Sequence, residues 1–285
     1  MSQWDPATLS TLSPYSRTLN LRYRPVVGSK GCVQLVPSAS NRGAGSGELD
    51  RRCIVGLIDH AMGYTLQASG AGLMPGATLN LRVDFESFES IEGGLEAVCR
   101  VRQRHSGGAL LVAEVSTGAG LPVALGTSFF TQRTFPGKVG LEEARLSDYQ
   151  PGPEIHCYAQ GIGLSALNGC WQLAGGHLGA VGWEPGNTFH GGAVGSLLVA
   201  SAEAVLAADM RIVSLSISYL RPSRADLPLQ AQCRPVRLGG SASFYTVQCY
   251  QQDQRKPVAV AEVCCVREAL NDSASGAGTI IRRST

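Results

Sequence analysis

A histidine and two glycines stand side by side, as His190-Gly191-Gly192, directly before the apolar run "AVGSLLVA". Such a run predicts a helix, and the glycine pair would lie at its first turn, where backbone N–H groups have no partner within the helix. N–H groups of this kind stabilise an oxygen that gains negative charge during a reaction. The stretch therefore suggests chemistry at a polarised oxygen, but the apolar run after it has no acid or base.

The sequence also repeats itself, which places a second helix of the same kind earlier in the chain. "GCVQL" at 31–35 returns as "GCWQL" at 169–173, and "LEAVCR" at 95–100 returns as "LQAQCR" at 229–234. Further matches follow in the same order, "LNLRVDF" (79–85) with "LSISYL" (215–220) and "PVALGTSFF" (122–130) with "PVAVAEVCC" (257–265). A collinear series of this kind predicts one fold that occurs twice.

Each copy reads as an opening strand, a loop rich in Gly, Ser and Pro, one apolar helix and about four strands. The helices are expected at Cys53–Ala68 and Gly192–Ala207, and their few charges predict burial on most sides. The segments "ALLVAEVST" and "FYTVQCYQ" alternate with period two, as strands do. The expected fold class is α+β, in which an antiparallel sheet holds one long buried helix, twice over.

These elements predict the domain organisation. The first unit is expected at 28–133 and the second at 155–268, joined by a linker at 134–154 that is rich in Pro, Gly and charge. Residues 1–27 form an N-terminal extension, and 269–285 form a flexible tail.

Composition narrows the function classes. The chain has 24 basic and 22 acidic residues in interspersed positions, which disfavours nucleic-acid binding. No stretch is long and apolar enough for a membrane span, and the first residues lack the pattern of a secretory signal, so a cytoplasmic location is expected. The nine cysteines lack the spacing of a zinc site, so no metal is expected.

Three motifs resemble the hotdog-fold acyl-CoA thioesterases of the phenylacetate-pathway and hydroxybenzoyl-CoA type. They are "HGG" (190–192) at a helix start, "YLRP" (219–222) on the strand after it, and "GLIDHAMG" (56–63) in the first helix. The resemblance covers most of 28–268 and implies a tandem, or double, hotdog. It also implies an acyl-CoA or acyl-carrier-protein substrate and no cofactor other than the CoA of the substrate, and it allows a homodimer of double hotdogs.

The family places an Asp or Glu nine residues after the histidine, where this chain has Val199. The repeat aligns His190 with Asp50, so the corresponding position in the first copy is Asp59. Nine helical residues span roughly 13.5 Å, whereas an attacking group must come within about 3–3.5 Å of the carbonyl carbon. One helix therefore cannot supply both groups, and we expect one composite site between the two units. The counterpart site, Asp50-Arg51-Arg52 with Val199, would be lost.

Each candidate has an expected role and a plainer alternative. The N–H of Gly191 would bind the thioester oxygen, and Gly192 would allow close approach. Simple packing of the loop against the helix is the alternative for both glycines. His190 would orient the site or cap the loop. Asp59 would be a base or a nucleophile, because a carboxylate on an apolar helix is costly unless it is paired or useful. Its alternative is a bond to His60, Arg51 or Arg52.

Substrate contacts are predicted less directly. The family's Asn or Gln six residues before the histidine is replaced by Glu184, and Asn187 is the nearest substitute. Arg221 and Arg224, or Arg51 and Arg52, are candidates for CoA phosphates, since Arg makes bidentate phosphate contacts. Surface arginines are the alternative.

Two further functions stay open on sequence alone. A hydroxyacyl hydratase or dehydratase of the same fold also needs a histidine and an acid across the interface. The third possibility is a non-catalytic acyl-thioester-binding or assembly protein.

Overall fold

The computed structural model describes residues 13–69, 73–134, 149–182 and 187–268. Residues 1–12 of the predicted extension, most of the predicted linker, Glu184 and the predicted tail at 269–285 lie outside the described residues. The described residues contain both copies of the repeat.

The described part of the first copy contains one long helix and six strands. Its helices and strands are α2 (Pro14–Thr18), β1 (Leu21–Val27), β2 (Lys30–Leu35), η1 (Ala39–Asn41), α3 (Cys53–Ala68), β3 (Leu73–Phe85), β4 (Leu95–His105), β5 (Gly108–Thr117) and β6 (Pro122–Thr134). The expected helix at Cys53–Ala68 is confirmed. Part of the predicted extension is structured, because β1 pairs with β2 and the side chain of Tyr15 is fully buried.

The second copy repeats this order of elements. It consists of α5 (Tyr158–Gly161), β7 (Leu164–Leu167), β8 (Cys170–Leu173), η2 (Leu178–Ala180), α6 (Gly191–Glu203), β9 (Met210–Tyr219), β10 (Leu229–Arg237), β11 (Ala242–Tyr250) and β12 (Pro257–Arg267). Helix α6 ends four residues before the predicted Ala207. The N–H groups of Val205 and Leu206 bond to carbonyls three residues back, so the chain tightens into turns there.

All described strands belong to one antiparallel sheet, ordered β1-β2-β4-β5-β6-β3-β9-β12-β11-β10-β8-β7. The order is the same when read inward from either edge, with β3 and β9 at the centre. There Leu81 pairs with Ile217 and Val83 with Leu215. The repeat aligns Leu81 with Leu215 and Val83 with Ile217, and because the two strands are antiparallel, each residue pairs with the counterpart of its neighbour two positions away. The expected α+β class with an antiparallel sheet is confirmed.

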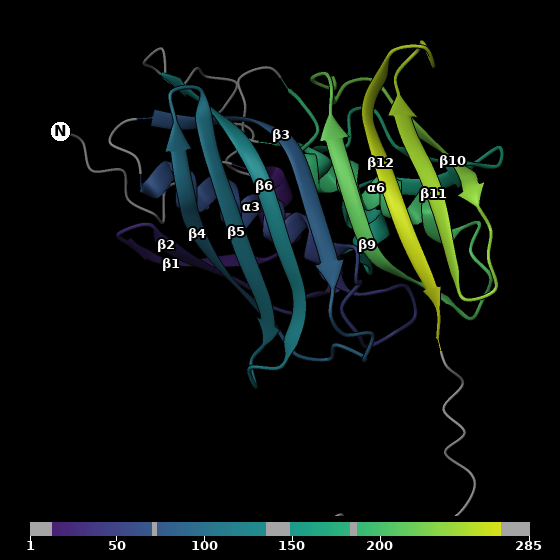
Figure 1. The fold of residues 1–285 in the computed structure, drawn as a ribbon, viewed down its shortest axis with the longest axis horizontal. Helices are drawn as coiled ribbons and strands as arrows, with labels where there is room; N and C mark the ends of the chain where they lie inside the picture. Colours follow the sequence, from purple (N-terminus) through teal and green to yellow (C-terminus); the bar gives the residue numbers. More distant parts are fainter. Residues whose placement is uncertain (1–12, 70–72, 135–148, 183–186, 269–285) are drawn as a thin grey trace, which may run out of the picture.

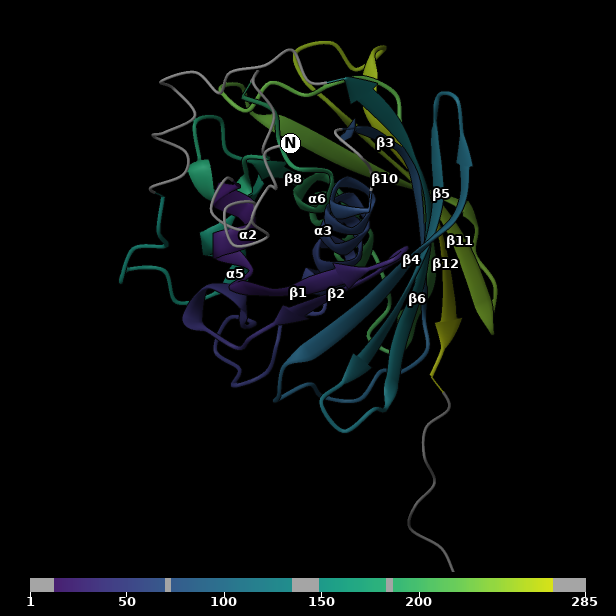
Figure 2. The same cartoon turned by 90° about the vertical axis from the view of Figure 1, so that its left-hand side faces the viewer.

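The strands of the first copy form one half of the sheet, and the strands of the second copy form the other half (Figure 1). Seen along the sheet, it curves around α3 and α6, which lie next to each other in its concave side (Figure 2). Most residues of both helices are buried, as their composition predicts. No helix among the described residues is long and apolar enough to cross a membrane.

The two helices pass closest at a pair of glycines. A Cβ added to Gly192 would lie 2.5 Å from the Cα of Gly56 and 3.0 Å from the hydroxyl of Tyr15. The hydroxyls of Tyr15 and Tyr158 lie 2.6 Å apart, and Tyr158 reaches Ser196 of α6 at 2.9 Å. Glycine at the crossing and this buried hydroxyl network thus hold α3 against α6.

Replacing Gly192 with alanine is expected to destabilise the fold by about 1–3 kcal/mol, because the new methyl group meets backbone atoms that cannot move aside. Gly63→Ala is the matched control, since its Cβ would meet Phe130 at an ordinary 3.7 Å. The control is expected to be neutral or more stable by up to about 1 kcal/mol. Urea midpoints at unchanged m-value measure both. Equal midpoints would refute the close crossing.

Candidate active site

A cavity of about 520 Å³ opens between the two copies of the repeat. From the first copy it is lined by α3 and β3, including Asp59, His60 and Thr78. From the second it is lined by the start of α6 and the end of β9, including His190 and Gly191. Its size and mixed lining are those of a small-molecule site. The sequence-predicted Asp59, His190 and Gly191 therefore share one cavity.

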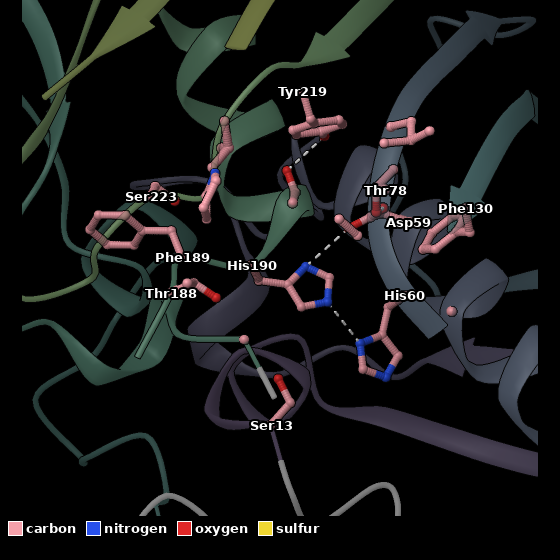
Figure 3. A pocket seen from close by; sticks show the side chains of 18 of the residues that line it. Ser13, Asp59, His60, Thr78, Phe130, Thr188, Phe189, His190, Tyr219 and Ser223 are labelled. Carbon is pink, nitrogen blue, oxygen red and sulfur yellow. Dashed lines mark hydrogen bonds and ion pairs between the residues drawn. The ribbon is translucent and has the colours of Figure 1, made fainter. Parts of the chain in front are cut away.

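Asp59 occupies the middle of α3, and its side chain is only 3% exposed. The hydroxyl of Thr78 on β3 donates to its Oδ1 at 2.9 Å. Its Oδ2 lies 3.2 Å from Nδ1 of His190 on the other helix (Figure 3). The alternative partners His60, Arg51 and Arg52 make their side-chain contacts elsewhere. The carboxylate is therefore held between β3 and α6.

Burial sets the acidity of this carboxyl group. Removal from water raises the pKa of Asp59 from 3.8 to about 6, although hydrogen bonds from the Thr78 hydroxyl and the Gly192 N–H oppose the rise. A carboxylate with such a pKa is ionised at neutral pH and is a better base than an exposed one.

His190 is the N-cap of α6 as well as the neighbour of Asp59. Its Nδ1 accepts the N–H of Gly192 at 3.0 Å, so the capping role considered from the sequence is present. The ring stacks on Tyr15, with centroids 4.5 Å apart. Burial lowers the pKa of His190 to about 3. The ring is therefore neutral at physiological pH.

The two glycines face different neighbours. Gly191 lines the cavity, and a Cβ on it would lie 2.7 Å from Oδ2 of Asp59. Its carbonyl oxygen accepts the hydroxyl of Tyr219 at 2.9 Å, which ties the first turn of α6 to the end of β9. Gly192 packs on α3 instead, so the close approach expected of it is a contact between helices rather than with a ligand.

The sequence did not predict Thr78, His60 or Tyr23 as site residues, although His60 lies within the "GLIDHAMG" motif. Thr78 lies on a strand nineteen residues after Asp59, and only the fold brings the two together. His60 places Nδ1 3.2 Å from Nε2 of His190, and its Nε2 lies 2.7 Å from the hydroxyl of Tyr23 on β1. The adjacency of His60 to Asp59 in the sequence suggested a bond between these two side chains, but His60 contacts His190 and Tyr23 instead.

Of the three predicted substrate-binding residues, one lines the cavity and two do not. Arg221 lines the cavity and donates to the carbonyl of Pro257 at 2.7 Å. Asn187 and Arg224 are exposed and are not among the described residues that line this cavity. Arg224 pairs with Asp226.

A second cavity of about 340 Å³ lies at the counterpart position. It is lined by Arg51 and Val199, with Glu203 one turn further along α6. Arg51 donates to the carbonyls of Ser87 and Glu89, and the Arg52 side chain bonds to Asp50 at 2.8 Å. These side chains occupy the place that the His-Gly-Gly motif has in the first site.

Among the described residues, no group of three or more His, Cys, Asp or Glu side chains is arranged to hold a metal ion. The residues around the first cavity can supply a carboxylate, neutral imidazoles, hydroxyls and a helix N-terminus. Such a set suits acid–base chemistry at a carbonyl group.

Comparison with protein families gives one match. Residues 180–266 match the family described as acyl-CoA thioesterase N-terminal domain. The match includes the His-Gly-Gly motif and the strand that carries Tyr219. It confirms the resemblance of these residues to an acyl-CoA thioesterase. No curated protein sequence matches the chain.

Solved structures with a similar fold cover most of the chain. A hot dog fold protein from Alicyclobacillus acidocaldarius is 11% identical with a TM-score of 0.58, over 90% of this chain and 98% of its own. A putative oleoyl thioesterase from Lactobacillus plantarum is 10% identical with a TM-score of 0.58, over 85% and 98%. The tesB protein of Mycobacterium avium subs paratuberculosis is 13% identical with a TM-score of 0.57, over 91% and 100%. The fold is therefore of the hotdog type.

Proposed function

From a hotdog-type fold whose residues 180–266 match an acyl-CoA thioesterase domain, we propose that the protein hydrolyses an acyl thioester of CoA or of a carrier protein at the cavity between its two copies. The observation that carries the proposal is the meeting of Asp59 from α3 with Gly191 from α6, where a Cβ on Gly191 would lie 2.7 Å from Oδ2 of Asp59.

The two copies are, in this proposal, two hotdog units fused in one chain. The equal order of strands read from both edges supports it, as does the pairing of β3 with β9 at the centre. Each unit contributes one half of the site, Asp59 from the first and His190 with Gly191 from the second. A single unit would lack either the carboxylate or the helix start.

Hydrolysis would begin when the carboxylate of Asp59 takes a proton from water. The hydroxide attacks the thioester carbon, and the N–H of Gly191 stabilises the negative charge on the carbonyl oxygen. Collapse of this adduct breaks the carbon–sulfur bond, and the leaving thiolate takes the proton from Asp59. The products are a carboxylic acid and a free thiol, so the acid–base cycle closes without a cofactor. Thr78 fixes Oδ1 of the carboxylate for this task.

Free-thiol release from short, long and aromatic acyl-CoAs tests the reaction. The preferred acyl group would identify the substrate class. Water addition to an enoyl-CoA without thiol release would show a hydratase instead. No release from any acyl-CoA or acyl-carrier protein would refute the proposal.

The pH dependence of kcat/KM is expected to follow the ionisation of Asp59. Because the base must be unprotonated and burial raises the pKa of Asp59 to about 6, kcat/KM should rise through pH 6 and level off above it. Below pH 6 the loss should approach tenfold for each pH unit. A profile that stays flat between pH 5 and 7.5 would contradict the assignment of the base.

A further inference from the structure

Four side chains form a line of short contacts that leads from Asp59 away from the carbonyl site. Oδ2 of Asp59 lies 3.2 Å from Nδ1 of His190, and Nε2 of His190 lies 3.2 Å from Nδ1 of His60. Nε2 of His60 lies 2.7 Å from the hydroxyl of Tyr23. Figure 3 shows the first three side chains in sequence along the wall of the cavity. The hydrolysis proposed above uses only the first of them.

One backbone N–H of α6 indicates which nitrogens carry protons along this line. The N–H of Gly192 donates to Nδ1 of His190 at 3.0 Å, so that nitrogen is an acceptor. Burial lowers the pKa values of His190 and His60, so each ring is neutral and carries one proton. The proton of His190 must then be on Nε2, from which it is donated to Nδ1 of His60. His60 in turn donates from Nε2 to the hydroxyl oxygen of Tyr23.

The geometry of the two rings fits this direction. Their planes differ by 20° and their centroids lie 5.3 Å apart. With two nitrogens 3.2 Å apart, the rings meet edge to edge, as a hydrogen bond in the plane of an imidazole requires. The bond between His190 and His60 is therefore well directed.

The tautomer of His190 determines which form of Asp59 is favoured. A bare Nδ1 places a lone pair 3.2 Å from Oδ2, where it repels the carboxylate but can accept a proton held on that oxygen. The opposite tautomer would donate a proton to the carboxylate and favour its ionised form. The bare nitrogen thus favours the protonated Asp59 that forms when water loses its proton.

We propose that His60 and Tyr23 are positioning residues that keep His190 in the Nε2–H tautomer and so make Asp59 a stronger base. The catalytic consequence rests on the proposed thioester hydrolysis, whereas the tautomer itself does not. His60 acts through His190, and Tyr23 acts through His60.

Other groups near Asp59 and His60 do not account for this effect. The phenols of Tyr15 and Tyr219 lie near Asp59, and that of Tyr64 packs beside Tyr23. Burial raises the pKa of each, so all are neutral. The Thr78 hydroxyl and the N–H of Gly192 both donate to the carboxylate and favour its ionised form. Among the described residues, no Lys or Arg side chain forms an ion pair with Asp59, and the neighbouring His190 is neutral. The tautomer of His190 is therefore the feature around Asp59 that can change the basicity of its carboxylate.

The test compares His60→Leu, His60→Asn and the wild type. Leucine removes the acceptor for Nε2–H. His190 can then carry its proton on Nδ1 and donate it to Asp59, while the N–H of Gly192 keeps the carboxylate of Asp59 as its acceptor. A hydrogen bond to a charged group corresponds to about 1–2 pH units, and the acidic limb of kcat/KM should move down by that amount. The Oδ1 of asparagine occupies the place of Nδ1, so His60→Asn should keep the limb near its wild-type position. Tyr23→Phe should shift the limb in the same direction as His60→Leu.

Nitrogen-15 spectra of the five histidines provide the readout that is independent of turnover. His190, assigned with His190→Gln, should show a protonated Nε2 in the wild type and in His60→Asn, and a proton on Nδ1 in His60→Leu. A wild-type His190 protonated at Nδ1, or the same tautomer and limb in His60→Leu as in the wild type, would overturn the proposal. Absence of thiol release with the expected tautomers would refute the hydrolysis and leave the tautomer assignment standing.

Discussion

Asp59→Asn is expected to lower kcat/KM for thioester hydrolysis by at least about 10³-fold, because the amide cannot take a proton from water. Asparagine has nearly the same shape and can still accept the Thr78 hydroxyl, which Asp59 receives at 2.9 Å. The substrate should therefore still bind. Thiol release at saturating acyl-CoA and calorimetric binding of the same thioester measure the two effects separately.

The same substitution should stabilise the fold at neutral pH. Burial raises the pKa of Asp59 from 3.8 to about 6, so the folded state loses stability as pH rises through this interval and keeps the full penalty above it. One pKa unit corresponds to about 1.36 kcal/mol, so the variant should gain about 3 kcal/mol at pH 8 and about half of that at pH 5. Opposite effects on activity and stability would mark Asp59 as functional rather than structural.

Asp50→Asn provides the control for this variant. Asp50 is also a buried carboxylate, but it accepts the backbone N–H and the side chain of Arg52, just before α3 and away from the first cavity. It should lose stability and keep kcat/KM within about a few-fold of the wild type. If Asp59→Asn hydrolyses thioesters as fast as Asp50→Asn does, Asp59 is not the base.

Gly191→Ala is expected to lower kcat/KM by about 10²–10³-fold, mainly through kcat, the range found when one donor to an oxyanion is lost. The new methyl group would point at Oδ2 of Asp59 from 2.7 Å and would crowd the space where the carbonyl oxygen must lie. Steady-state thiol release gives kcat and KM separately.

Gly195→Ala is the matched control for this second variant. It adds a methyl group one turn further along α6, where the Cβ meets the side chain of Val55, and Gly195 is not among the described residues that line the cavity. Its kcat should stay within about a few-fold of the wild type. Because alanine keeps the backbone N–H, the loss must come from crowding, and a Gly191→Ala enzyme with unchanged kcat would show that the reacting oxygen does not lie against residue 191.

Regular elements with strong patterns could be predicted from the sequence. Helix α3 begins and ends at the predicted Cys53 and Ala68, because its apolar run is long and has few charges. The segments that alternate with period two are the strands β5 and β11. The end of α6 was predicted too late because Ala204, Val205 and Leu206 are apolar residues in turns, which composition does not distinguish from helix.

The repeat predicted only those site residues that lie on the two aligned helices. The alignment of two helices led from His190 to Asp59, and the structure places these two side chains 3.2 Å apart. Thr78 and Tyr23 are distant in sequence and have no motif, so only the packed sheet reveals their contacts. For Gly192 the structure shows the packing alternative, and the sequence could not choose, because a glycine that allows two helices to cross looks the same as one that faces a ligand.

The central claim is that Asp59 and the start of α6 act on the same thioester carbonyl. A crystal structure of Asp59→Asn with a bound acyl-CoA tests it most directly. The carbonyl oxygen should accept the N–H of Gly191 at about 2.7–3.1 Å, and a water held by residue 59 should face the carbonyl carbon from about 3–3.5 Å. A thioester bound instead in the second cavity, beside Arg51 and Val199, would contradict the account.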